Sequence, residues 1–153
     1  MKIIFIHLLN DFSGSPKVLS QIVKNYKNKN HDVELFTSKD EGFLSNIVDK
    51  HHNFFYKRFE NKFLTLFSYT LSQFHLFFKI LFSKSNIVYI NTLLPFGAAL
   101  GAKISKKEVI YHIHETSIKP NILKKFLRYI VSITASKIIF VSNDLAQKEK
   151  FEN

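Results

Sequence analysis

The sequence predicts an α/β fold, a single Rossmann-like doubly wound domain with a mostly parallel sheet of about six strands. Short apolar runs such as residues 2–7 (KIIFIH) and 137–142 (KIIFVS) lack polar alternation, which is typical of strands buried on both faces. These runs alternate with segments of helical spacing, and right-handed crossovers then place helices on both faces of the sheet. At 153 residues, the chain has the size of one ordinary domain.

In the first half of the chain, a strand over residues 2–7 leads through a polar loop into a helix. Pro16 suits the first turn of this helix because it has no N–H to leave unpaired. Apolar residues then recur at helical spacing as far as Tyr26. A polar turn at 28–32 follows. The next expected elements are a strand at 33–37, a short helix at 43–48 and a strand at 53–56.

Residues 61–83 form the longest expected helix, and its polar residues make one stripe along an otherwise apolar cylinder. The uncharged stretch 63–78 is only 16 residues long and includes Ser, Thr, Gln and His, which is too short and polar for a membrane span. Two interpretations remain: a core helix with a narrow exposed edge, or an interfacial helix. The stripe consists of Thr65, Ser68, Ser72, His75, Lys79 and Ser83.

In the second half, a strand at 86–91 precedes a helix at 95–104. Gly97 and Gly101 in this helix indicate close packing, which we expect to be against the sheet. Asn143 and Asp144 can cap a last helix that begins at Leu145. The other expected elements are a strand at 109–114, a helix at 121–134 and a strand at 137–142.

The composition excludes several classes of chemistry, and the start of the sequence predicts a cellular compartment. The chain has no cysteine, which excludes disulfides, zinc–thiolate sites and thiol catalysis. The start of the chain resembles no secretory signal, so we expect a cytoplasmic protein. The net charge is +10, and residues 51–100 carry five basic residues against one acidic residue. A basic surface attracts nucleic acid, anionic lipid or phosphorylated ligands without choosing among them.

Aromatic residues favour lipid among these partners. The chain has 17 Phe and no Trp, and many of the Phe lie within residues 54–82 beside Lys and Arg. This combination suits an anionic membrane surface, where rings enter the acyl boundary and cations meet lipid phosphate. Peripheral attachment to the inner face of the plasma membrane is therefore one expectation. No recognised nucleic-acid motif occurs, so we expect no nucleic-acid partner.

Candidate site residues lie where the expected strands end, because ligands of open parallel sheets bind beyond the carboxyl ends of the strands. Ser13, Gly14 and Ser15 occupy the loop before the first helix, where backbone N–H groups can approach a phosphate. This loop does not match the G-x-G-x-x-G or P-loop patterns. His112 and His114 share a strand face, but the sequence identifies no third ligand, and we expect no metal. The other strand-end residues are His7, Asn91, His114, Glu115, Ser142 and Asn143.

The order of these parts resembles the N-terminal half of family 4 glycosyltransferases, which have the GT-B fold of two Rossmann-like domains. The loop and helix at 11–19 look like the family's Gly-Gly-x-Glu-x-x-Leu segment, except that Ser13 precedes Gly14 and Lys17 stands where Glu is common. The likeness covers essentially the whole chain. Its other parts are the strand at 2–7, Asn91 before 95–97, the strand at 109–116 that contains His114, and the strand at 135–143.

The resemblance implies transfer of a sugar from a nucleotide-diphosphate sugar to an acceptor hydroxyl, with no other cofactor. It implies that Gly14 lies near the donor diphosphate, His114 near the reacting centre, and Asn91 and Glu115 on the acceptor side. It also implies a second, donor-binding domain with a Glu-x7-Glu motif, and residues 1–153 correspond to the acceptor-side domain alone. We therefore expect a half that is inactive without a donor-binding domain or subunit. The alternative is a membrane-surface module that binds a sugar or lipid-linked acceptor without catalysis.

Overall fold

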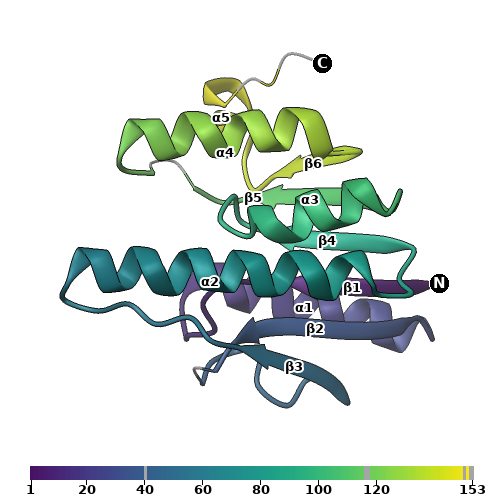
Figure 1. Cartoon of the computed structure of the whole chain (residues 1–153). Helices are drawn as coiled ribbons and strands as arrows, with labels where there is room; N and C mark the ends of the chain where they lie inside the picture. Colours follow the sequence, from purple (N-terminus) through teal and green to yellow (C-terminus); the bar gives the residue numbers. More distant parts are fainter. Residues whose placement is uncertain (40, 116–117, 150, 152–153) are drawn as a thin grey trace.

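Six parallel strands form one twisted sheet in the computed structural model, which describes residues 1–39, 41–115, 118–149 and 151 (Figure 1). The strands are β1 (Lys2–Ile6), β2 (Asp32–Ser38), β3 (Lys50–Phe54), β4 (Ile87–Asn91), β5 (Glu108–Ile113) and β6 (Lys137–Phe140). The helices are α1 (Gly14–Asn28), α2 (Lys62–Leu81), α3 (Phe96–Ile104), α4 (Asn121–Thr134) and α5 (Asn143–Lys148). The predicted fold class is confirmed, and every strand pair is parallel.

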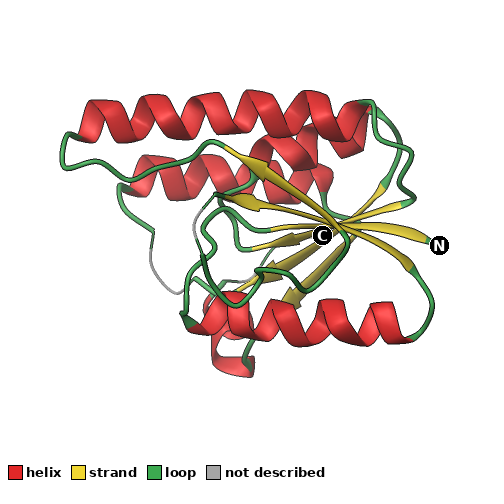
Figure 2. Cartoon of the chain, turned by 90° about the horizontal axis from the view of Figure 1, so that it is seen from below, coloured by secondary structure: helices red, strands yellow, loops and turns green. Residues whose placement is uncertain are grey.

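The strand order is β3-β2-β1-β4-β5-β6, so β1 lies between β2 and β4. Helix α1 covers one face of the sheet, and α2, α3 and α4 cover the other (Figure 2). Alternate residues of each central strand enter different cores because successive side chains point to opposite faces. Thus Ile3 and Phe5 pack with Leu19 of α1, whereas Ile4 and Ile6 share the second core with α2 and α3.

Residues 43–48 do not form the expected helix, and the third strand begins earlier than expected. The chain from Gly42 makes turns, and Asn46 has φ of 57°, which a right-handed helix cannot contain. Asn10 fixes these turns: its Oδ1 accepts from Leu44 N at 3.1 Å. Strand β3 spans Lys50–Phe54 rather than 53–56, because its backbone pairs with β2 from Lys50 onward.

The glycines of α3 pack against a helix rather than against the sheet as expected. A Cβ added at Gly97 would lie 2.1 Å from the carbonyl oxygen of Gln73, and one at Gly101 would lie 2.5 Å from that of Phe77. The backbones of α2 and α3 are therefore in direct contact. Gln73 is buried at this contact, and its Oε1 accepts from Gly97 N at 3.0 Å.

Helix α2 is turned with part of its polar stripe inward and most of its large apolar residues outward. Ser68, Ser72 and Gln73 are buried, whereas Phe63 and Phe67 are 83% and 68% exposed. The interpretation of α2 as a core helix with a narrow exposed edge is therefore wrong, because its exposed face is wide and apolar. Small and polar side chains face inward because the glycine surface of α3 leaves no room for rings. The apolar residues of α2 with exposed side chains are Phe63, Leu64, Leu66, Phe67, Leu71, Phe74 and Phe78, and Phe82 follows directly.

No helix within the described parts of the chain has the length and hydropathy needed to cross a bilayer.

Candidate functional site

The candidate site lies where β1 and β4 end, at the point where the strand order reverses. Helix α1 follows β1 on one face of the sheet, and α3 follows β4 on the other face. The two connections leave the sheet on opposite faces there. In this class of sheet, ligands usually bind at such a point, in the crevice beyond the carboxyl ends of the strands. Asn91 is the last residue of β4, and His7 follows β1 directly.

Asn91 is fully buried and joins three of the elements at this edge. Its Nδ2 donates to Ser15 Oγ at 2.8 Å, and its Oδ1 accepts from His114 Nε2 at 2.9 Å. Nδ2 also lies 3.1 Å from His7 Nδ1. Because the amide oxygen faces His114, the hydrogen-bond network assigns the ring proton of His114 to Nε2 and leaves Nδ1 as the acceptor.

The imidazoles at this edge are neutral at pH 7. Burial lowers the pKa of His7 to about 4. Desolvation lowers the pKa of His114 to about 4 as well, with further lowering from the neighbouring His112 and His7. The pKa of His112 is also lowered by desolvation, and its Nδ1 lies 2.9 Å from the hydroxyl of Tyr89. The neutral ring of His114 can therefore accept a hydrogen bond from a ligand hydroxyl through Nδ1.

Backbone donors hold the carboxylate of Glu115 beside this cluster. Its Oε1 accepts from Leu93 N at 3.1 Å, and its Oε2 accepts from His114 N at 3.3 Å. Desolvation nevertheless raises the pKa of Glu115. Thr92 directly follows Asn91 at the end of β4 and has φ of 82°, which is a strained value for a β-branched residue. Strained backbone of this kind persists where the surroundings fix it and is concentrated at functional sites.

The start of α1 leaves open space for a ligand. Gly14 is the first residue of α1, and a Cβ added there would meet no atom within 4 Å. Ser13 is the N-cap residue, but its side chain makes no cap hydrogen bond and its hydroxyl donates to Asp11 Oδ1 instead. The free N–H groups of the first turn can thus approach an anion, although Asp11 adds a negative charge nearby.

Two of the sequence-derived candidates lie away from this cluster. Ser142 follows the edge strand β6, and its Oγ accepts from Leu145 N at 3.1 Å as the cap of α5. Asn143 is the exposed first residue of α5. The cap is therefore Ser142 rather than Asn143 or Asp144, and the helix begins two residues before Leu145. Asn91 contacts both Ser15 and His114, and Gly14 and Glu115 are adjacent to these two residues in the chain.

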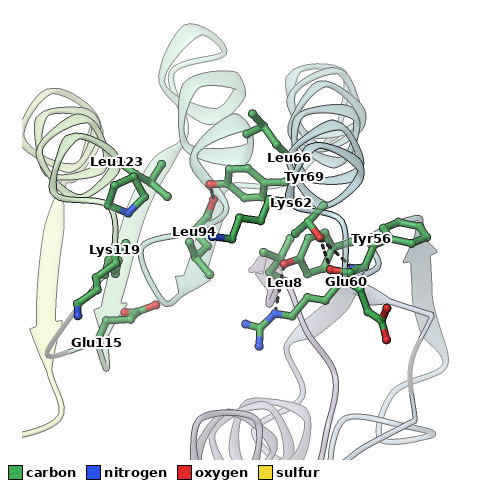
Figure 3. Close-up of a pocket in the computed structure, with 15 residues that line it drawn as sticks. Leu8, Tyr56, Glu60, Lys62, Leu66, Tyr69, Leu94, Glu115, Lys119 and Leu123 are labelled. Atoms are coloured by element: carbon green, nitrogen blue, oxygen red, sulfur yellow. Dashed lines mark hydrogen bonds between the residues drawn. The ribbon is translucent and has the colours of Figure 1, made fainter.

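A pocket of about 720 Å³ adjoins the cluster and contains residues that the sequence analysis missed (Figure 3). It lies between the N-terminal ends of α2 and α4 and includes Glu115. Arg58, Lys62 and Lys119 also line it. The signal for Arg58 and Lys62 was their place in the aromatic segment 54–82, but nothing in the sequence pairs them with Lys119.

The described residues contain no group of three or more potential metal ligands. The ring centroids of His112 and His114 lie 4.3 Å apart, but Nδ1 of His112 is already in a hydrogen bond with the Tyr89 hydroxyl.

Comparisons with known structures show the same fold. HepE from Anabaena, solved with UDP and glucose, is 17% identical and has a TM-score of 0.67 over 97% of this chain and 40% of HepE. The lipopolysaccharide outer core galactosyltransferase WaaB is 19% identical, with a TM-score of 0.68 over 99% of this chain and 43% of WaaB. A UDP-N-acetylglucosamine 2-epimerase is 12% identical, with a TM-score of 0.66 over 97% of this chain and 44% of the epimerase.

HepE and WaaB are GT-B glycosyltransferases, and this chain spans less than half the length of each of the three neighbours. Because they include an epimerase as well as transferases, the fold alone does not select the reaction. No curated protein sequence matches the chain. The sequence model of Glycosyltransferase Family 4 matches residues 12–148, from the loop before α1 to the end of α5. The match spans most of the chain, which therefore belongs to glycosyltransferase family 4.

Proposed function

We propose that this chain is the acceptor-side half of a glycosyltransferase that moves a sugar from a nucleotide-diphosphate sugar to an acceptor hydroxyl, in surface polysaccharide or glycolipid synthesis. The observation that carries the proposal is the bond between His114 Nε2 and Asn91 Oδ1 at 2.9 Å. It fixes a neutral imidazole at the crevice, close in the chain to Glu115 and across from the open start of α1.

Each group has a role in this proposal. The N–H groups at the start of α1 receive the leaving diphosphate, because Gly14 leaves the space open and the helix N-terminus favours negative charge. His114 accepts a hydrogen bond from a sugar hydroxyl through Nδ1, while Asn91 keeps Nε2 occupied. Positioning and stabilisation of the leaving diphosphate lower the barrier. Most donor contacts come from a donor-binding half outside this chain.

The first experiment measures UDP release from UDP-glucose and UDP-galactose. We expect no turnover by the 153-residue chain alone. We expect turnover when it is co-expressed with a donor-binding domain encoded directly downstream. Turnover by the chain alone would contradict the half-enzyme proposal.

In the completed enzyme, His114→Ala should lower kcat about 100-fold or more, because a group at the reacting centre is lost. His31→Ala is the matched control, since His31 lies in the turn before β2 at the opposite edge of the sheet. Equal activity of the two variants would remove His114 from the proposed chemistry.

Attachment to an anionic membrane surface is a second proposed property, favoured by the outward apolar face of α2. Phe67 and Phe74 are 68% and 61% exposed, and Lys62 and Lys79 lie on the same helix. On the same face of the sheet, beyond α3, helix α4 adds Ile122, Phe126 and Tyr129 as exposed apolar or aromatic side chains. Rings enter the acyl boundary while lysines meet lipid phosphates at such a surface.

Co-sedimentation with phosphatidylglycerol–phosphatidylcholine vesicles tests this attachment. The double variant Phe67→Ser/Phe74→Ser should lose most vesicle binding and keep its thermal stability, because both rings are exposed. Val18→Ser/Ile104→Ser is the control, with two exposed apolar residues on α1 and α3. Unchanged binding of the α2 variant would show that this face does not carry the attachment.

A further inference from the structure

The pocket between α2 and α4 exists because the helix between them is short. Helix α2 has 20 residues and α4 has 14, but α3 has only nine. The N-terminal ends of α2 and α4 project beyond α3 (Figure 1). The space beyond the start of α3 has Leu8 and Leu94 at its base and Tyr69 on one wall (Figure 3). The hydroxyl of Tyr69 donates to the carbonyl oxygen of Leu94 at 2.6 Å, which ties α2 to the loop before α3.

Three cations at this pocket have no carboxylate partner among the residues that the structure describes: Arg58, Lys62 and Lys119. Several other surface cations are paired. Lys50 contacts Asp32 at 2.8 Å, for example, and Lys124 contacts Glu149. Arg58 is instead held by the phenol of Tyr56, which lies 3.5 Å from its Nε.

Two carboxylates also line the pocket, but they do not neutralise these cations. The carboxylate of Glu115 accepts from two backbone N–H groups, and desolvation raises its pKa. Glu60 is exposed on the loop before α2. The unpaired cations therefore outnumber the carboxylates, and arginine and lysine are the side chains that recognise phosphate.

The remaining wall of the pocket is apolar and continues onto the exposed face of α2. Leu66 lines the pocket and is 60% exposed, and Phe63 and Phe67 lie beside it on the helix. On the opposite wall, Leu123 belongs to α4, next to the exposed Ile122. The hydrocarbon chain of a bound lipid could thus extend out of the pocket along these apolar side chains, which are otherwise exposed to water.

We infer that this pocket binds the phosphate-bearing end of a lipid-linked acceptor, with Arg58, Lys62 and Lys119 on the phosphate and Leu66 and Leu123 on the first part of the lipid chain. The inference rests on the proposed sugar transfer, because it names the class of acceptor. Glu115 joins this pocket to His114, so a sugar or hydroxyl attached to the bound phosphate would extend toward the crevice.

Titration calorimetry of the 153-residue chain with four small probes tests the inference. Farnesyl diphosphate carries both a diphosphate and an apolar chain. Farnesol carries only the chain, inorganic diphosphate only the charge, and UDP the diphosphate of a nucleotide. We expect farnesyl diphosphate to bind about tenfold or more tighter than each of the others, since only this probe engages both the cations and the apolar wall.

Variants then locate the site. Arg58→Gln/Lys62→Gln should weaken farnesyl diphosphate binding about tenfold or more. Lys103→Gln/Lys106→Gln removes the same charge at the far end of α3 and should leave binding unchanged. Leu66→Ser should weaken binding of farnesyl diphosphate but not of inorganic diphosphate. Leu66 is exposed, so this variant should keep its fold, which thermal unfolding checks.

Three results would overturn the inference: no binding of farnesyl diphosphate, equal loss in the two lysine-containing double variants, or UDP binding that matches farnesyl diphosphate and depends on Arg58 and Lys62. The last result would assign the pocket to the donor. The UDP-release assay decides the proposed function separately. Lipid-phosphate binding by the chain, with no transfer by the completed enzyme, would contradict the proposed transferase but keep the lipid-phosphate site. Transfer by the completed enzyme, with no lipid-phosphate binding by the chain, would contradict the site but keep the transferase.

Discussion

At the scale of single residues, Asn91 has the largest role because its one amide satisfies partners on three elements. Ser15 belongs to α1, His7 follows β1, and His114 follows β5. A buried polar group that loses its partner costs about 1–3 kcal/mol, and several would lose theirs together. The function proposed for His114 thus depends on a residue that a ligand cannot reach, since Asn91 is fully buried.

We predict that Asn91→Ala lowers the free energy of unfolding by about 2–4 kcal/mol, because it leaves His7, Ser15 and His114 without their common partner. Urea denaturation monitored by circular dichroism measures this. The exposed Asn121→Ala, at the start of α4, is the control and should change stability by about 0.5 kcal/mol or less. A small effect at Asn91 would mean that water replaces its hydrogen bonds.

The buried histidines make stability depend on pH in a predictable direction. The pKa of His7 falls from 6.5 to about 4 on folding because burial disfavours the charged ring. The unfolded chain therefore binds more protons between these values, and stability is lost as the pH falls through this range. For His7 alone, the loss between pH 7 and pH 5 is about 2 kcal/mol. His114 acts in the same direction.

The pH prediction is tested by urea midpoints at these two pH values for the natural chain and for His7→Gln. The variant should be less stable at pH 7 but should lose less stability on acidification. A midpoint that shifts equally in both proteins would place the pH dependence on other groups.

The strand-end rule found part of the site from sequence, and its success and failure have the same cause. It selected Asn91 and His114 because parallel strands end at one edge of the sheet. It also selected Ser142, which caps α5, because a polar residue after a strand can start a helix as well as bind a ligand. Lys119 gave no signal, because its neighbours in the pocket lie on a segment far away in sequence.

At the scale of elements, the contact between α2 and α3 explains the orientation of α2. The glycines of α3 bring the backbones together, and Ser68 and Ser72 are small enough for the space that remains. Helical periodicity predicted α2 correctly as a helix, but periodicity does not state which stripe is buried. The packing partner decides this, and the sequence analysis placed the glycines against the sheet.

We predict that Gly97→Ala destabilises the chain by about 3 kcal/mol, because its Cβ would lie 2.1 Å from the carbonyl oxygen of Gln73 and backbone must shift. The melting temperature measures this. Gly14→Ala is the matched control, since a Cβ there meets nothing within 4 Å. If both variants melt together, α2 and α3 separate more easily than their packing indicates.

At the scale of the whole molecule, the sequence predicted the fold well because buried parallel strands are apolar on both faces. Strand β1 shows this pattern most clearly. Strand β6 has a similar apolar sequence, but it lies at the edge of the sheet and its apolar side chains are only partly buried, so the expectation of burial on both faces was wrong there. The edge strand β3 was misplaced because His51 and His52 are not apolar, and its pairing with β2 through the backbone carries no sequence pattern. The family assignment adds that this domain is one part of a larger architecture in its structural neighbours.

The net charge of +10 predicts that vesicle binding depends on salt. Exposed charges are screened more strongly as the Debye length falls, so binding to phosphatidylglycerol vesicles should weaken several-fold between about 0.05 M and about 0.5 M KCl. Phosphatidylcholine vesicles, which carry no net charge, are the control and should show little salt dependence. Salt-independent binding to both would indicate attachment through the apolar face alone.

The glycine contact between α2 and α3 has a consequence for an apolar environment. Hydrophobic burial stops holding two helices together once hydrocarbon surrounds them, but close backbone packing and interhelical hydrogen bonds persist there. Helix α2 is joined to α3 by such packing at Gly97 and Gly101 and by the bond from Gly97 N to Gln73 Oε1. Detergent or lipid around its phenylalanines would thus leave α2 attached to the domain, so the pocket beside it would keep its shape at a membrane.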